Sequence, residues 1–242
     1  MKGLRLIVVL GALVLLGGAA IVLGIPWAKG IYLEHRLFPN RISYELQDAP
    51  AAPTRAERVQ AWLEKNRSWI VAAEKRFHIS RIAIGGLIAY EALVDVHLSR
   101  YAGLANWSGP GKVHFKQYRF AEGDPLAKQV EDMGMLPKRT MQQREKILQT
   151  AQWSSLYIAA SMRALANIVR QETRHDISCD PGALVTLDSA WTLHSAKRYF
   201  ATHHRKHFVF TDNFAGNWVT GQQAFLRRAV GASAVCPVPF HN

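Results

Sequence analysis

The fold of this chain is decided by the stretch Phe77-His78-Ile79-Ser80-Arg81-Ile82-Ala83-Ile84-Gly85-Gly86-Leu87-Ile88-Ala89-Tyr90-Glu91-Ala92. Residues 82–90 carry no charged side chain, and a helix that is apolar on every face belongs in the interior of a domain. The adjacent pair Gly85 and Gly86 would let a neighbouring helix come close. We therefore predict a buried central helix, and the first charged residue after its apolar run is Glu91.

An amphipathic pattern precedes this run. Thr54 and Glu57 match a capping box, in which a hydroxyl and a carboxylate each accept a backbone N–H of the first helical turn. Ser80 is expected to cap the buried helix itself. Between these caps, the apolar residues recur mostly at three- and four-residue steps, which predicts a helix with one buried face: Val59, Trp62, Leu63, Ile70, Ala73 and Phe77.

The rest of the chain also favours helices. Residues 100–118 are rich in glycine, proline and small polar residues and predict an irregular loop that lines a cleft, with a small hairpin near residues 113–119. Further helices are predicted after Asp124-Pro125, over residues 138–148, over residues 153–168, after Asp180-Pro181, and over residues 217–230, where Gly231 ends the last one. The fold class is mainly α.

The N-terminus holds a long uncharged segment. Residues 6–28 contain no charge and, at about 1.5 Å per residue, are just long enough to span a bilayer as a helix. A cleavable signal peptide, cut near Gly18-Ala19-Ala20, is the alternative. We expect a transmembrane anchor over residues 1–29, a linker or arm over residues 30–53, and one folded domain over residues 54–242.

Charge and cysteine content limit the possible binding partners and the cellular compartment only loosely. The chain has 30 basic and 18 acidic residues and a formal net charge of +12, so polyanions such as nucleic acid, anionic lipid or the acidic polymers of a bacterial wall are attracted to it. No nucleic-acid-binding motif is present, and no nucleic-acid partner is expected. Cys179 and Cys236 are compatible with one disulfide in an exported domain and equally with two reduced, buried thiols.

Glu91 is the candidate catalytic residue. A carboxyl group at the end of an apolar helix loses solvation, which raises its pKa and keeps it protonated, as a general acid must be. On position alone, Glu91 could also be merely the first exposed residue of the helix. Asp95, one helical turn further on, is the candidate second carboxylate, and a solvated neighbour is the plainer interpretation of it.

The stretch from Phe77 to Ala92 resembles the catalytic-helix motif of the goose-type lysozyme and lytic transglycosylase superfamily, in which an apolar helix leads into one glutamate. Residues 109–117 are similar to its glycine-rich segment ending in glutamine, and residues 157–162 to its third motif helix. The glycine-rich segment looks closer to bacterial toxin-like muramidase domains than to housekeeping transglycosylases. A Tyr-Asn pair common in the transglycosylases is missing near residues 184–193, where Thr186, Asp188 and Trp191 stand instead.

This resemblance implies a lysozyme-like helical domain with a small loop or β excursion. It implies a peptidoglycan-degrading glycosidase, a muramidase or lytic transglycosylase, that acts on glycan strands from the periplasmic side of an inner membrane. Glu91 would be the general acid, and the residues expected to contact substrate or orient the acid are Lys112, His114, Gln117, Tyr157 and Asp95.

Two other functions stay open at this point, and the weaker of them is a basic, membrane-anchored protein that binds nucleic acid or anionic lipid, for which no binding motif is present. A non-catalytic, membrane-anchored module that binds peptidoglycan would keep the same fold and basic surface without cleaving anything. The histidines His203, His204 and His207 could share a helix face, but they lack an HExxH motif and lie beside Arg205 and Lys206, which favours a basic surface over a metal site. No metal and no cofactor is expected.

Overall fold

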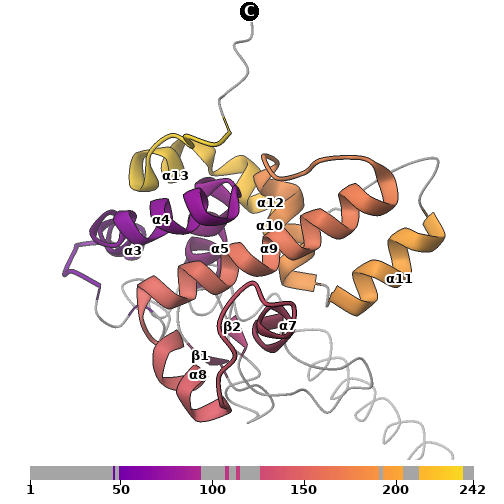
Figure 1. Ribbon diagram of the computed structural model, residues 1–242. Coiled ribbons are helices and arrows are strands. Elements are labelled where there is room, and N and C mark those ends of the chain that lie inside the picture. The colour runs from indigo at the N-terminus through magenta and orange to yellow at the C-terminus, as the bar shows by residue number, and fades with distance from the viewer. Residues whose placement is uncertain are drawn as a thin grey trace, which may run out of the picture.

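The computed structural model describes Leu46 and residues 49–93, 107–108, 113–114, 126–190, 193–203 and 213–236. This part of the chain is mainly helical (Figure 1). The predicted anchor over residues 1–29 and most of the arm over residues 30–53 lie outside it. Within the described ranges, no helix is both long enough and apolar enough to cross a membrane.

The described helices are α3 (Arg55–Lys65), α4 (Arg67–Phe77), α5 (Arg81–Leu93), α7 (Leu126–Asp132), α8 (Met141–Leu148), α9 (Ala151–Thr173), α10 (Pro181–Ala190), α11 (Leu193–His203), α12 (Phe214–Gly221) and α13 (Gln223–Val230). Two short strands, β1 (Trp107–Ser108) and β2 (Val113–His114), pair antiparallel. The small hairpin was expected to continue downstream of Val113, but the strand that pairs with β2 lies upstream of it, and residues 115–125 lie outside the described ranges.

The predicted central helix is confirmed, because every residue of α5 is buried. The helices α3, α4, α9, α10, α12 and α13 all pack against it, and Figure 1 shows α5 behind the long helix α9. The two glycines allow the close approach expected of them. A Cβ placed on Gly85 would lie 2.9 Å from Val230, and one placed on Gly86 would lie 2.8 Å from Val219.

The amphipathic segment before α5 forms two helices, not one. The capping box of Thr54 and Glu57 is present, and the predicted apolar stripe is buried. At Asn66, however, the backbone leaves helical geometry with φ −102° and ψ 10°. The Asn66 side chain donates a hydrogen bond to the carbonyl of Trp62 at 3.0 Å. This local bond competes with the helical pattern and ends α3 there.

The predicted helix near the C-terminus is also divided. It begins at Phe214, where the Asn213 side chain accepts the backbone N–H of Gly216 at 2.8 Å, and it breaks at Gln222. Gly231 ends α13 with φ 80°, as its position predicted. Asp180 is confirmed as the cap of α10, because its carboxylate accepts the backbone N–H of Ala183 at 2.9 Å.

The closest helix crossing lies between α10 and α12. A Cβ placed on Gly216 would lie 2.5 Å from the carbonyl oxygen of Gly182, and one placed on Gly182 would lie 3.3 Å from the carbonyl oxygen of Gly216. Each glycine also leaves room for a threonine of the facing helix, Thr186 beside Gly216 and Thr220 beside Gly182. This contact brings α12 and α10 together beside α5.

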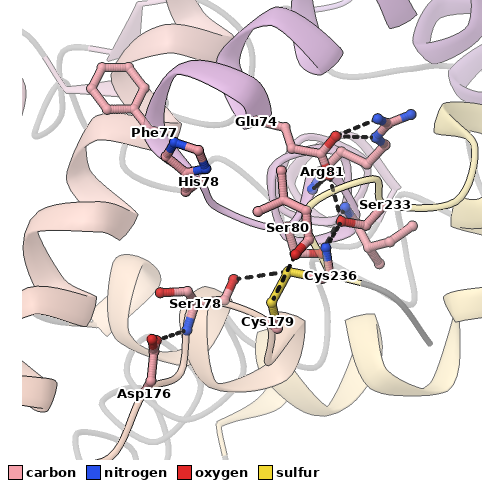
Figure 2. Close-up of a disulfide and its surroundings, with 12 residues drawn as sticks. Glu74, Phe77, His78, Ser80, Arg81, Asp176, Ser178, Cys179, Ser233 and Cys236 are labelled. Atoms are coloured by element: carbon pink, nitrogen blue, oxygen red, sulfur yellow. Dashed lines mark hydrogen bonds and ion pairs between the residues drawn. A yellow bond between two sulfur atoms is a disulfide. The ribbon is translucent and has the colours of Figure 1, made fainter. Parts of the chain in front are cut away.

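A disulfide joins Cys179, just before α10, to Cys236 (Figure 2). The backbone N–H of Cys236 donates to the hydroxyl of Ser233 at 2.9 Å, and that hydroxyl donates to the buried carboxylate of Glu74. Glu74 also forms an ion pair with Arg81 at the start of α5. Burial alone would raise the pKa of Glu74, but the hydrogen bonds from Arg81 and Ser233 outweigh it and lower the pKa. The residues that follow α13 are thereby tied to α4, α5 and α10.

Candidate active site

Glu91 is buried at the last turn of α5, with 3% of its surface exposed. The possibility that it is merely the first exposed residue of this helix is therefore excluded. The guanidinium of Arg55, from α3, donates two hydrogen bonds to the carbonyl of Ala92, at 3.2 and 2.7 Å. A cation at the C-terminus of a helix satisfies an unpaired carbonyl and complements the helix dipole. Arg55 thus fixes the turn of α5 that carries Glu91.

Tyr90, the neighbour of Glu91, faces α12. Its ring centroid lies 6.2 Å from that of Phe214 and 5.9 Å from that of Trp218. Burial and the charge of Glu91 raise the pKa of Tyr90 to about 12, so its phenol is neutral at physiological pH. Phe214 is 44% exposed, so this aromatic group reaches from the core beside Glu91 to the surface.

The loop residues predicted to line the cleft are described only in part. β2, which includes the backbone of His114, contacts α7 and α9. The side chain of His114 and the residues Lys112, Gln117 and Asp95 lie outside the described part of the chain. The sequence prediction for these four residues therefore stays a prediction.

Tyr157, on α9, is held by a buried charged network. Its hydroxyl donates to the carboxylate of Glu131 from α7 and accepts a hydrogen bond from Arg139 at 3.2 Å. Arg144, from α8, donates to both oxygens of Glu131, at 2.8 and 2.7 Å. A phenol has one proton to donate, and here Glu131 receives it. Tyr157 therefore cannot at the same time donate to Glu91, which was the orienting role expected of it.

Burial and hydrogen bonds oppose each other at Glu131. Burial alone would raise the pKa of Glu131, but the hydrogen bonds from Arg144 and Tyr157 outweigh it and lower the pKa. Arg139 stacks on Trp153, with its guanidinium carbon 4.1 Å from the ring centroid. The network joins α7, α8 and α9 on the side where β2 lies.

Asp188 is a second acid beside α9, near the end of α10. Its carboxylate accepts a hydrogen bond from Ser161 at 2.5 Å. Burial raises the pKa of Asp188 to about 7, although the bond from Ser161 acts in the opposite direction. In the sequence, Asp188 stands out only as a departure from the transglycosylase pattern. Its partner on α9 is distant in the sequence, so no local motif indicates the pair.

The described residues form no group of three or more histidine, cysteine or acidic side chains that could hold a metal ion. His204 and His207 lie outside the described ranges, and the same holds for the side chain of His203. The chemical groups offered by the described residues are one buried carboxyl on α5, next in sequence to the aromatic Tyr90, and one partly exposed carboxyl on α10.

Comparison of the chain with protein-family models, with curated proteins and with solved structures finds no match.

Proposed function

We propose that this protein is a glycosidase that cleaves the glycan strands of peptidoglycan, with Glu91 as the general acid. The observation that carries the proposal is the burial of Glu91 at the end of a helix that is itself buried on every face. A carboxyl group in such a place is costly to keep, because a buried polar group loses its hydration. Groups of this kind concentrate at functional sites.

The chemistry needs little beyond this group and a bound sugar. Protonated Glu91 gives its proton to the glycosidic oxygen, the bond from that oxygen to the anomeric carbon breaks, and the leaving sugar departs as an alcohol. Water, or a hydroxyl of the same sugar in a transglycosylase, bonds to the anomeric carbon and releases a proton. The basic surface of the chain, with its formal charge of +12, favours an acidic wall polymer as the substrate.

The proposed place of action is the periplasmic side of an inner membrane, reached through residues 6–28. The disulfide between Cys179 and Cys236 supports this proposal, because disulfides persist in oxidising compartments and are rare in the cytosol. The Ser233 and Glu74 contacts around the bridge show that the fold is built around it.

The test compares purified sacculi incubated with the full-length chain, with Glu91→Gln and with Glu64→Gln. Glu64 is an exposed glutamate on α3 that bonds Gln60, so its replacement controls for the loss of one carboxylate. We expect soluble glycan fragments from the wild type and from Glu64→Gln, and at least a 100-fold lower rate from Glu91→Gln with an unchanged circular dichroism spectrum.

Full activity of Glu91→Gln would end this assignment. Tight pelleting of the wild type with sacculi, without release of any fragment, would instead indicate a peptidoglycan-binding module that does not cleave.

A further inference from the structure

Asp188 differs from Glu74 and Glu131, two buried acids of the described structure that each have a cationic partner. Glu74 faces Arg81, and Glu131 faces Arg144, each as an ion pair. Among the described residues, no cation faces Asp188, and the hydrogen bond to its carboxylate comes from Ser161. In a chain with 30 basic residues, a partly buried acid without a cation is an exception that structural stability does not explain.

The position of Asp188 on its helix further destabilises the charged form of its carboxyl. Asp188 lies in the last turn of α10, where the helix dipole is negative and disfavours a carboxylate. The charged form is therefore destabilised by burial and by the dipole together.

Glu91 and Asp188 lie at similar heights along two neighbouring helices. α5 and α10 start side by side, since the backbone N–H of Ser80 donates to the carbonyl of Ser178 at 3.1 Å, and the two helices pack against each other. Glu91 is the eleventh residue of α5 and Asp188 the eighth of α10. At about 1.5 Å per residue, the two acids stand about 15 Å and about 11 Å from these starts, and the two distances differ by less than one helical turn.

Glu91 also points toward the sector that contains Asp188. Around the axis of α5, Gly85 meets α3 and α13, Gly86 meets α12 and α13, and Tyr90 meets α12. Each successive residue is rotated by about 100° around the helix axis. Glu91, the residue after Tyr90, therefore points past α12 and away from α3 and α13. α4 meets α5 at the opposite end, through Glu74 and Arg81. Among the described helices, the other neighbours of α5 are α9 and α10, which carry Ser161 and Asp188.

We propose that Asp188 is the second carboxylate of this site, the base that activates water, which makes the protein a hydrolase and not a lytic transglycosylase. This inference rests on the proposed function. As Glu91 protonates the leaving oxygen, a water molecule attacks the anomeric carbon and its proton passes to Asp188. The products are two sugar chains, one with a new reducing end. Glu91 ends as a carboxylate and Asp188 as an acid, and both exchange protons with solvent.

Within the described part of the chain, few groups around Asp188 titrate. The described helices packed against α10 are α5, α9 and α12, and α12 has no ionisable residue. The ionisable residues on the other two are Arg81, Tyr90, Glu91, Tyr157, Arg163, Arg170 and Glu172. Arg163 donates to the carbonyl of Phe77 and to Ser178, at the start of α10 and away from Asp188. A carboxyl that titrates near neutral pH, as Asp188 does, suits a general base.

The test measures release of soluble fragments from sacculi by the full-length chain between pH 5 and pH 9. The variants are Asp188→Asn, which keeps an oxygen for Ser161 to bond, and Asp132→Asn, an exposed acid on α7 paired with Lys128, as the matched control. We expect Asp188→Asn to lower kcat by roughly 100-fold or more with little change in KM, and Asp132→Asn to behave as the wild type.

Azide supplies a second readout, because this anion attacks carbon without needing a base. Azide should restore turnover in Asp188→Asn and yield a glycosyl azide, while Glu91→Gln should not respond. Ser161→Ala covers the case in which Asp188→Asn fails to fold. It removes the bond that lowers the pKa of Asp188, so the rise of activity with pH should move to higher pH.

Each outcome separates this inference from the proposed function. Anhydro ends on the wild-type products, or an unchanged kcat and pH profile in Asp188→Asn, would overturn the role of Asp188 and leave Glu91 as the acid. A folded Ser161→Ala with a wild-type pH profile would do the same. If the wild type releases nothing while Asp132→Asn and the wild type are both folded, the proposed function and the inference both fall.

Discussion

Single residues in this protein differ most in how their buried charge is compensated. Arg144→Met should leave the carboxylate of Glu131 buried without its cation, at a cost of about 3–5 kcal/mol in the free energy of unfolding. Lys128→Met, which breaks the exposed pair with Asp132, is the control and should change stability far less. Urea denaturation at pH 7 measures both variants, and equal effects would contradict the assignment of Glu131 as a buried anion.

The same pair predicts a pH dependence of stability. The pKa of Glu131 is lowered from 4.5 in the fold, so the native state binds fewer protons than the unfolded state when the pH is near or below 4.5. Its contribution is full above about pH 4.5 and is lost as the pH falls through the lower pKa of the fold. Glu131→Gln should therefore be most destabilised, relative to the wild type, at neutral pH, and the difference should shrink in acid.

The raised pKa of Asp188 predicts that stability changes with pH in the opposite direction. Its pKa is raised from 3.8 to about 7, so the native state holds a proton that the unfolded state has already lost, and stability falls as the pH rises through this interval. Asp188→Asn should raise Tm at pH 8 and change it little near pH 3.5. Calorimetry at these two values tests it. A variant less stable than the wild type at pH 8 would show that the charge of Asp188 is compensated.

How far a residue could be predicted depended on whether its signal is local. Glu91 could be singled out as a candidate from the sequence, because the apolar run that leads into it lies directly before it. The bond from Ser161 to Asp188 spans 27 positions, and the bond from Tyr157 to Glu131 spans 26. No spacing rule of a helix or strand relates residues so far apart, so neither pair could be found before the helices were assembled.

At the scale of helices, the crossing of α10 and α12 leaves no room for a side chain at Gly216. Gly216→Ala would push a methyl group to within 2.5 Å of the carbonyl oxygen of Gly182, so the helices must separate, at a cost of about 1–3 kcal/mol or more. Gly221→Ala, in the same helix, meets nothing within 4 Å and should be neutral or slightly stabilising. Thermal unfolding of the two variants measures the difference, and similar Tm values would contradict the crossing.

Helix existence was better predicted than helix length. The caps at Thr54, Ser80 and Asp180 were identified from residue type and spacing, and α5 was identified from its uniform apolarity. The breaks at Asn66 and Gln222 were missed. The apolar stripe continues across each break, because both helices of each pair face the same core. Periodicity alone therefore does not reveal the bend between them.

At the scale of the whole molecule, the disulfide closes a loop with a sequence separation of 57 residues. Cys179→Ser with Cys236→Ser should lower the free energy of unfolding by roughly 2–4 kcal/mol, because the unfolded chain regains the freedom that the bridge removes. Denaturation of the wild type with and without a thiol reductant should show the same loss. Unchanged stability in both experiments would mean that the bridge contributes nothing to the fold.

The sequence sufficed to predict the mainly helical class and the central place of α5, since both follow from composition and periodicity. It did not predict how the other helices surround α5, because that arrangement depends on contacts such as Gly182 with Gly216 and Arg163 with Phe77, far apart along the chain. The two cysteines were equally compatible with reduced thiols until the fold brought them together.

The burial of α5 by other helices affects when the core can form during synthesis. Two of its neighbours, α3 and α4, precede it in the chain, while α9, α10, α12 and α13 follow it, and Gly85 meets Val230 at the end of α13. A ribosome or a translocation pore that delivers residues in order releases α5 long before the four later helices that cover it have emerged. The core around Glu91 therefore closes only after α13 has emerged. Until then, the apolar run is a natural target for chaperones.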